Sequence, residues 1–199
     1  MAFNVNDFKA RLPGGGARST LFEVDLTGPP GLQMPDKTKF LVRAASIPSA
    51  DIQVISIPYF GRNIKTPGDR QFAPWTVTII NDEDFAVRNV LEKWSNSINE
   101  FVGNKRKKPT TGLGAGNVEN YKASQSKVTQ YAKDGAVLRR YIFNGLFPSV
   151  IQPIELSWDS TNTIEEFQVQ FEYDYWTLDD SVGTNKYTLA DQNGTSVGI

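Results

Sequence analysis

The chain contains neither cysteine nor histidine among its 199 residues. Without cysteine it has no disulfide, no thiolate nucleophile and no cysteine-ligated zinc site. Without histidine it lacks the usual base of a catalytic triad and a common metal ligand. Enzymes that depend on either side chain are therefore excluded, and we expect no metal, no cofactor and no enzymatic activity.

The sequence also lacks a long apolar run and an excess of charge of one sign. No stretch approaches the roughly 18–20 consecutive apolar residues of a membrane-spanning helix. The first residues lack the apolar segment of a secretory signal, so we expect a protein made in a cytoplasm. Lys and Arg total 21 and Asp and Glu total 22, a formal net charge of −1. This balance argues against a protein that wraps nucleic acid.

Alternation of apolar and polar residues predicts strands. It is clearest over 165–176, where the odd positions from Phe167 to Tyr175 are apolar and the even positions are polar. We interpret this segment as one long strand, paired as a hairpin with 154–158 across the turn residues 159–162. Weaker versions of the pattern predict strands at about 20–26, 38–47, 51–57, 74–80 and 137–147.

One segment has helical spacing instead. Apolar residues recur every three or four positions from Val87 to Ile98, and acidic residues suited to a first helical turn precede them. We expect a helix near 84–101 packed on the sheets. One helix among about seven strands predicts a mainly β fold, with two packed antiparallel sheets in a sandwich or barrel and one flanking helix.

The distribution of glycine, proline and charge predicts the domain organisation. Residues 1–18 form a flexible N-terminal arm, 19–176 form a single domain, and 177–199 form a C-terminal extension. A flexible loop is predicted within the domain at about 103–118, where Pro and Gly accompany consecutive basic residues.

Two acidic groups could in principle carry chemistry. Glu172 and Asp174 lie on one face of the predicted strand, about 6–7 Å apart, a spacing that a pair of glycosidase carboxylates can use. A water-facing strand is the stronger explanation of both residues, since no residue nearby supplies the burial that would raise one pKa. Asp82, Glu83 and Asp84 could hold a hard cation. Capping of the following helix is the simpler interpretation.

Two segments of the predicted loop could in principle contact phosphate. The glycines from Gly112 to Gly116 lack the preceding strand and the Lys-Ser/Thr of a phosphate-binding loop, which favours a flexible loop. The basic run Lys105 to Lys108 has no aromatic residues interleaved with it. We therefore interpret it as solvated, or as meeting an acidic patch on a neighbouring subunit.

Several blocks of sequence resemble the tail tube proteins of T4-like contractile-tailed bacteriophages, over roughly 17–176. The longest are AASIPSADIQVISIPYFGRNIKTPGDRQFAPWTVTIINDE at 44–83 and GLFPSVIQPIELSWDSTNTIEEFQVQFEYDYW at 145–176. Shorter blocks are Ala17-Arg18 with Leu21-Phe22-Glu23-Val24, and Tyr121-Lys122 with Gln130-Tyr131-Ala132-Lys133-Asp134. The loop at 103–118 and the extension at 177–199 depart from the family's pattern.

The resemblance implies a structural virion protein with a tail-tube-like fold. Hexameric rings would stack into the inner tube of a contractile tail, and DNA would be ejected through the lumen without specific binding. The implied partners are the tail sheath, baseplate and tail terminator proteins, and assembly would take place in the host cytoplasm. The alternative is a tube protein of a type VI secretion-like or pyocin-like apparatus, for which the cargo would be protein.

Stacked rings need two unlike surfaces on each subunit. We hypothesise that the arm and the segment 51–68 supply contacts, because 51–68 has more apolar surface than an isolated hairpin can bury. The candidate interface residues are Ile52, Val54, Ile57, Tyr59 and Phe60. The alternative is a hairpin inside the core of the same domain.

A channel that lets DNA pass should have few basic side chains on its wall, since each neutralised phosphate strengthens binding. The polar face of the last predicted strand has this character. The candidate lumen-lining residues are Gln168, Gln170, Glu172 and Asp174.

Overall fold

The computed structural model describes residues 5–12, 15–105, 121–179, 181–182, 188–190 and 196–198. The helices in these ranges are α1 (Val5–Arg11), α2 (Thr38–Leu41) and α3 (Ala86–Ile98). The strands are β1 (Phe22–Asp25), β2 (Val42–Ala45), β3 (Asp51–Tyr59), β4 (Arg62–Gln71), β5 (Trp75–Ile80), β6 (Ala123–Tyr131), β7 (Val137–Ile151), β8 (Glu166–Glu172), β9 (Tyr175–Leu178), β10 (Thr188–Ala190) and β11 (Ser196–Gly198).

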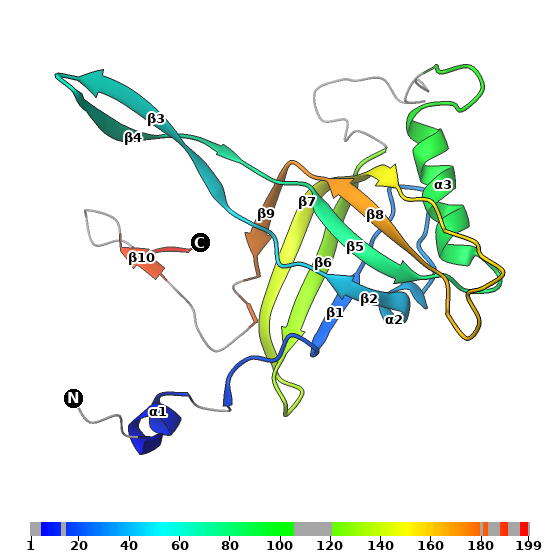
Figure 1. Cartoon of the computed structure of the whole chain (residues 1–199), viewed down its shortest axis with the longest axis horizontal. Coiled ribbons are helices and arrows are strands. Elements are labelled where there is room, and N and C mark those ends of the chain that lie inside the picture. The colour runs from blue at the N-terminus through cyan, green and yellow to red at the C-terminus, as the bar shows by residue number, and fades with distance from the viewer. Residues whose placement is uncertain are drawn as a thin grey trace.

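The main sheet has seven antiparallel strands, and β7 joins its two halves (Figure 1). The strand order is β1-β6-β7-β8-β5-β2, with β9 paired to β7 as well. Residues 137–146 of β7 pair with β6, whereas 147–151 pair with β8. The prediction of a mainly β fold with antiparallel sheets is therefore confirmed.

Gly145 lies where β7 passes from one half of the sheet to the other. Its φ is +71°, a left-handed conformation that glycine adopts without a steric penalty. A Cβ at this position would lie 2.0 Å from Oδ2 of Asp174. The bend therefore depends on both the missing side chain and the backbone freedom of this residue.

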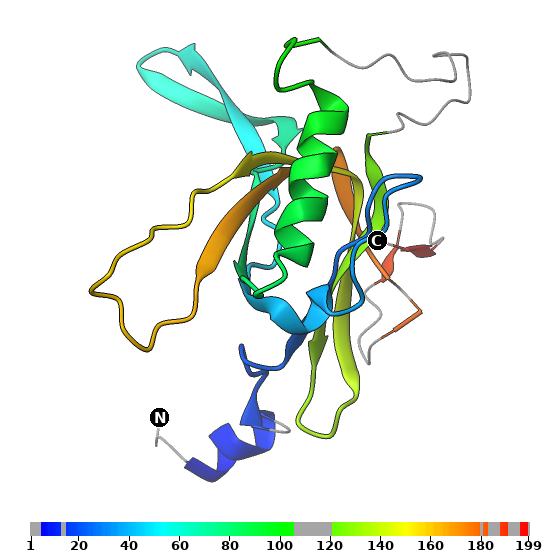
Figure 2. The ribbon, with the colours of Figure 1, turned by 90° about the vertical axis from the view of Figure 1, so that its right-hand side faces the viewer.

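The core lies between the two halves of the sheet and α3, which runs along one side of the sheets (Figure 2). Trp75 of β5 stacks on Phe143 of β7, with ring centroids 4.4 Å apart. The helix contributes buried Val87 and Leu91, together with Trp94. The indole N–H of Trp94 donates a 2.6 Å hydrogen bond to the carbonyl of residue 121, so this buried ring leaves no polar group unpaired. The predicted apolar stripe of the helix thus packs as expected.

The prediction of one strand over 165–176 is wrong at its C-terminal end. β8 ends at Glu172, and β9 begins at Tyr175 and pairs with a different part of β7. Between them the N–H of Asp174 bonds the carbonyl of Asn144 at 3.0 Å. The chain changes partner here, so the alternation holds from Phe167 to Tyr173 and ends at the exposed Tyr175.

The predicted hairpin between 154–158 and the last strand is also wrong. The neighbour of β8 is the end of β7, and 152–165 contain no strand. The last ladder contact is a bond from the N–H of Gln152 to the carbonyl of Gln168 at 2.8 Å. Pro153 follows and has no N–H with which to continue the ladder.

The strand predicted at 38–47 begins as a helix. Thr38 starts α2, and its hydroxyl donates a 2.6 Å hydrogen bond to the carbonyl of Pro35. The N–H of Leu41 bonds the carbonyl of Lys37, which closes one helical turn before β2. These local hydrogen bonds outweigh the apolar alternation of the segment.

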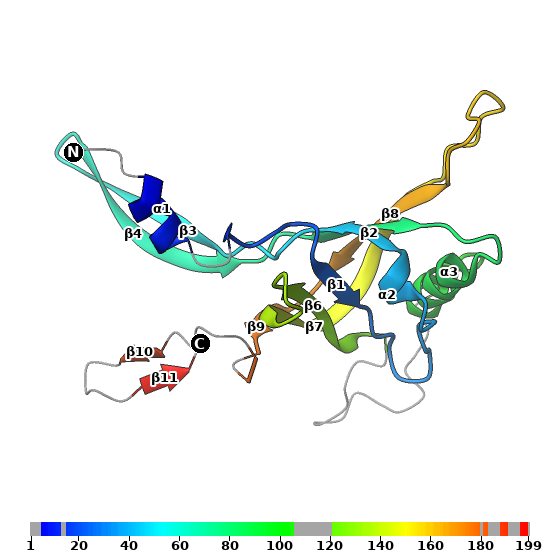
Figure 3. The same ribbon diagram turned by 90° about the horizontal axis from the view of Figure 1, so that it is seen from below.

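Two segments project from opposite ends of the molecule (Figures 1 and 3). One is the β3–β4 hairpin, which forms a separate two-stranded sheet. The other is the connection 152–165 between β7 and β8. Within the predicted arm, α1 has no buried residue. Most of the predicted loop at 103–118 lies outside the described residues, as does much of the predicted extension.

Replacing Gly145 by alanine should destabilise the subunit. The left-handed conformation penalises an L-residue by about 1–2 kcal/mol, and the new Cβ must also displace the Asp174 carboxylate. Gly135 is the matched control, since its φ is +84° and no atom lies within 4 Å of its Cβ position. Chemical denaturation should show Gly145→Ala to be more destabilising than Gly135→Ala. Equal losses would contradict a steric role for Asp174.

Candidate assembly interface

The β3–β4 hairpin leaves its apolar side chains in water. The strands pair from Asp51–Gln71 to Tyr59–Arg62, with an irregularity between Ile52 and Val54. The interpretation of 51–68 as a core hairpin is therefore wrong, because the hairpin stands outside the cluster of buried side chains. The exposed large apolar residues on it are Ile52, Val54, Ile55, Ile57, Tyr59, Phe60 and Ile64.

The hairpin's register distributes these residues over two faces. Side chains alternate along a strand, and directly paired residues share a face. Ile57 pairs with Ile64, so both lie on one face together with Ile55 and Tyr59. Ile52 and Val54 lie on the opposite face. Sequence reasoning missed Ile55 and Ile64, although both lie in β-prone runs on either side of Gly61, a residue type common in turns.

The turn of the hairpin has a conformation that suits its first residue poorly. Phe60 has φ +42° and Gly61 φ +77°, so both central residues are left-handed, as in a type I′ turn. Asn or Gly normally occupies the first position, and a bulky residue there is unusual. Phe60 is 91% exposed and contacts the edge of Tyr59, with centroids 4.6 Å apart. Strain at a solvent-exposed aromatic residue suggests a use outside the subunit's own stability.

We use the term hairpin tip for residues 57–65. One face carries the exposed apolar residues together with Arg62, whereas Lys65, which pairs with Ser56, lies on the other face. The hairpin tip contains no acidic residue. A two-stranded sheet is at most marginally stable alone, and both of its strands have free edges. The hairpin tip thus has the composition of a surface that becomes covered.

The outer face of β8 and β5 is polar and mostly uncharged. Gln168 pairs with Thr78 and Gln170 with Thr76, while the alternate residues of both strands face the core. Glu172 ends the same row on β8. Asp174 does not continue it, because it lies beyond β8 and its carboxylate pairs with Lys122 at 2.9 Å. The structure therefore brings three of the four candidate lumen residues onto one strand face.

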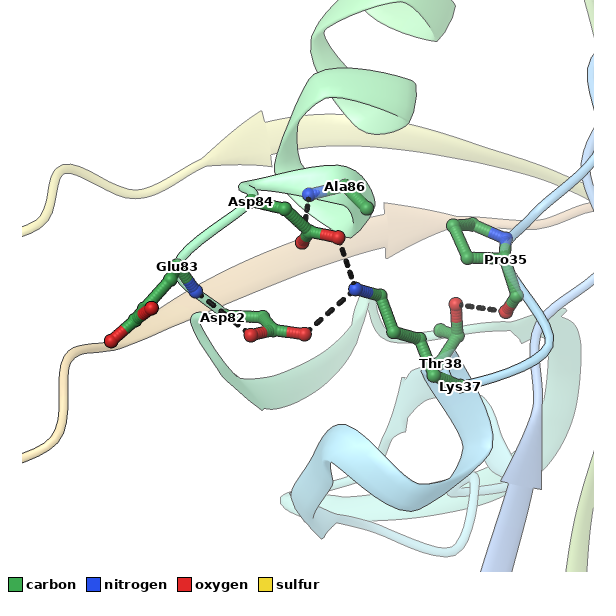
Figure 4. A network of polar contacts seen from close by, with 7 residues as sticks. All are labelled: Pro35, Lys37, Thr38, Asp82, Glu83, Asp84 and Ala86. Carbon is green, nitrogen blue, oxygen red and sulfur yellow. Dashed lines mark hydrogen bonds and ion pairs between the residues drawn. The ribbon is translucent and has the colours of Figure 1, made fainter.

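The acidic residues before α3 hold a lysine (Figure 4). Lys37 donates hydrogen bonds to Asp82 at 2.7 Å and to Asp84 at 2.5 Å. The other oxygen of Asp84 accepts from the N–H of Ala86, and the second oxygen of Asp82 accepts from the N–H of Glu83. The hydrogen bond from Lys37 lowers the pKa of Asp84. The pKa of Lys37 is raised, first by its hydrogen bond to Asp82 and then by its hydrogen bond to Asp84. Asp84 thus accepts from the N–H of the first residue of α3. The helix-capping interpretation is wrong for Asp82 and Glu83, because Phe85 is the N-cap residue and the first turn of α3 contains no acidic residue.

Other candidate sites gain little from the structure. Across the described residues, no three Asp or Glu side chains are grouped so as to hold a metal ion. In the same part of the chain, no helix has the length and apolar content to cross a bilayer. Lys105 precedes residues 106–120, so the rest of the basic run and the glycine segment lie outside the described residues.

Comparison with known proteins identifies the family. Residues 4–179 match the phage tail tube protein family. The chain belongs to this family. It is 32% identical to the tail tube protein gp19 of Enterobacteria phage T4, over 88% of this chain and 94% of that protein. It is 24% identical to the tail tube protein of Serratia phage KSP90, over 85% and 93% respectively.

A solved structure shares the fold at low identity. A chain in the baseplate of the anti-feeding prophage aligns with a TM-score of 0.60 and 9% identity, covering 82% of this chain and 95% of that one. The expected identity as a structural tail tube protein of the phage virion is confirmed. Its homologues are structural tail tube proteins, for which exposed apolar surfaces are expected to be contacts within an assembly.

Replacing Phe60 by asparagine should stabilise the isolated subunit by up to about 1 kcal/mol, because asparagine tolerates the left-handed conformation. Tyr59→Asn is the control, since residue 59 has no positive φ. Chemical denaturation of the subunit measures the difference. If Phe60→Asn gave no gain over wild type, the turn would not be strained by its side chain.

Replacing Lys37 by methionine should lower the free energy of unfolding at pH 7. It should also make that free energy fall less as the solution is acidified. Asp84 has a pKa below its ordinary 3.8, so it stabilises the fold above pH 3.8 and this stabilisation disappears as pH falls through the lowered value. Lys39→Met is the control: it also removes one lysine charge, but Lys39 forms no ion pair with Asp82 or Asp84. Denaturation curves from pH 7 to pH 2 would contradict the prediction if both variants showed the wild-type pH dependence.

Proposed function

We propose that six copies of the chain close into a ring and that the rings stack into the inner tube of a contractile tail. DNA then leaves through the lumen without being bound. Membership of the tail tube family supports the tube, and the resemblance to T4-like tail tube proteins suggests six subunits. The observation that carries the assembly is the apolar β3–β4 hairpin, which the subunit itself leaves uncovered.

The hairpin supplies one of the contacts between copies. Burying apolar surface contributes roughly 25 cal/mol per Å², so several large side chains at the hairpin tip give a substantial driving force once a neighbour covers them. A ring or stack is built from heterologous contacts, in which a surface on one subunit meets a different surface on the next. The β3–β4 hairpin is suited to this because it reaches beyond the subunit's own core (Figure 3).

The N-terminal arm supplies a second contact. Val5, Phe8 and Leu12 follow one another at helical spacing along α1 and its end, and all are exposed. A helix this short is marginal by itself, so packing of its apolar stripe on another subunit would stabilise it. We assign this arm to the stacking of rings.

The polar face of β8 and β5 lines the lumen. Thr76, Thr78, Gln168 and Gln170 present hydroxyl and amide groups in the centre of this face. Glu172 lies at one end of the row, and Glu166, which is paired with Arg43, lies at the other. Such a wall attracts phosphates weakly, because it releases few counterions. The sheath, baseplate and terminator proteins contact the remaining outer and end surfaces. The subunit works as a structural component, without a catalytic step or a cofactor.

Electron microscopy of the purified protein over a range of concentrations tests the assembly. Six-fold rings or stacked tubes are expected from the full chain. Ile57→Asp should prevent rings, and deletion of residues 1–18 should leave rings that do not stack. Asn89→Asp, a change of an exposed residue in the first turn of α3, is the control for a charge added elsewhere. Monomers at every concentration from the full chain would contradict the proposal.

The lumen assignment predicts a gain of DNA binding. Gln168→Lys with Gln170→Lys should make assembled tubes retain DNA at low salt and release it as salt rises. Asn89→Lys on the exposed side of α3 is the control for an added charge outside the lumen. Retention is measured with a labelled fragment at several salt concentrations. If both variants retained equal amounts of DNA, with the labelled fragment on the outside of the tube, the polar face of β8 and β5 would lie outside the lumen.

A further inference from the structure

The connection between β7 and β8 is a second exposed surface of unusual composition. We call residues 152–165 the acidic loop, because it contains Glu155, Asp159 and Glu165 and no basic residue. It also exposes large apolar side chains, with Trp158 102% and Leu156 79% exposed. Ile164 is exposed as well. A fully exposed tryptophan has no role in the packing of its own subunit.

The acidic loop is held in place at its base and at its end. Gln152 accepts a hydrogen bond from Arg88 at 3.2 Å, and Asn81 donates to the carboxylate of Glu165 at 2.9 Å. Near Trp158, the N–H of Ser160 bonds the carbonyl of Ser157, and the N–H of Thr161 bonds that of Asp159. These bonds present the apolar side chains in a defined arrangement, which lowers the entropy lost on binding.

The acidic loop and the hairpin tip are complementary. Each has exposed aromatic and aliphatic side chains, but the hairpin tip adds Arg62 and Lys65 whereas the loop adds Glu155 and Asp159. They lie at opposite ends of the molecule, so one subunit cannot join its own two surfaces (Figure 3). Complementary surfaces at opposite ends are what a heterologous contact between copies requires.

We propose that the acidic loop is the docking site for the hairpin tip of a second copy of this chain. Phe60 and Tyr59 pack against Trp158 and Leu156, and the basic side chains of the tip pair with Glu155 and Asp159. The proposal rests on the proposed function, since it names the surface that one subunit offers to the next. It also gives the strained Phe60 a partner.

Cross-linking tests the pairing directly, because the chain has no cysteine of its own. Asn63→Cys marks the hairpin tip and Ser160→Cys marks the acidic loop, and neither removes an apolar or charged group. A chain with both changes should give a ladder of covalent oligomers with a short bismaleimide, whereas either change alone should give none. Asn63→Cys combined with Asn89→Cys on α3 is the matched control.

The outcomes separate the pairing from the tube. Rings or tubes without cross-links between positions 63 and 160 would overturn the pairing and leave the proposed function standing. Cross-links from a protein that forms neither rings nor tubes would support the pairing and overturn the function. A ladder equally strong in the α3 control would show non-specific collision and overturn the pairing.

Charge reversal gives an independent test. One variant carries Arg62→Glu with Lys65→Glu, and the other carries Glu155→Lys with Asp159→Lys. Each alone should need about tenfold more protein to assemble, since like charges then face each other. Mixing them should restore assembly, because each altered surface then meets an opposite charge on the other variant. Failure of the mixture to recover would overturn the pairing.

Trp158→Ala tests the apolar part. Because this side chain is fully exposed, the denaturation midpoint of the isolated subunit should not change, while assembly should be lost or need at least tenfold more protein. Unimpaired assembly of this variant would overturn the proposal.

Discussion

The passage of one strand between two halves of a sheet determines how the rest of the subunit is arranged. β7 pairs with β6 up to Leu146 and with β8 from Phe147, so the bend at the adjoining Gly145 brings the two halves face to face. The stacked rings of Trp75 and Phe143 lie between those halves, and α3 covers one side of them. The end of β7 also fixes where the acidic loop begins. A straight β7 would leave neither a closed core nor a loop at that end of the molecule.

The apolar surface of the chain is divided between this core and the projections. The apolar side chains of the core are less than a tenth exposed, whereas the apolar side chains of the hairpin tip are half exposed or more. An isolated subunit gains nothing from apolar residues on a two-stranded sheet in water. Their presence is explained if burial occurs in two steps, with the core forming on folding and the hairpin tip covered on assembly.

The sequence was most informative where burial has a simple period. Alternation located β8 through Phe167 and Val169, and helical spacing located α3, because one face of each packs on the core. It was least informative for β6, which lies between β1 and β7 but has few apolar residues to alternate. It also gave the wrong partner for β8. The alternation at 154–158 suggested a strand, but the ladder with β8 ends before it, because Pro153 has no N–H to donate. The family was predicted from the resemblance of whole sequence blocks, because the periodicity of apolar residues indicates strands and helices but not a family.

The candidate interface could be predicted only in part, for a reason unrelated to secondary structure. Ile57 and Phe60 stand out in the sequence as surplus apolar surface, but a pattern within one chain does not say whether the core or a neighbour covers them. The structure excludes the core. The distance between the hairpin tip and the acidic loop then matters, because surfaces that cannot meet within a subunit are available to join successive subunits. The proposed contact between the hairpin tip and the acidic loop would bury only a few aromatic and aliphatic side chains, so it would be weak alone. A closed ring in which every subunit made two such contacts would be favoured over open pairs.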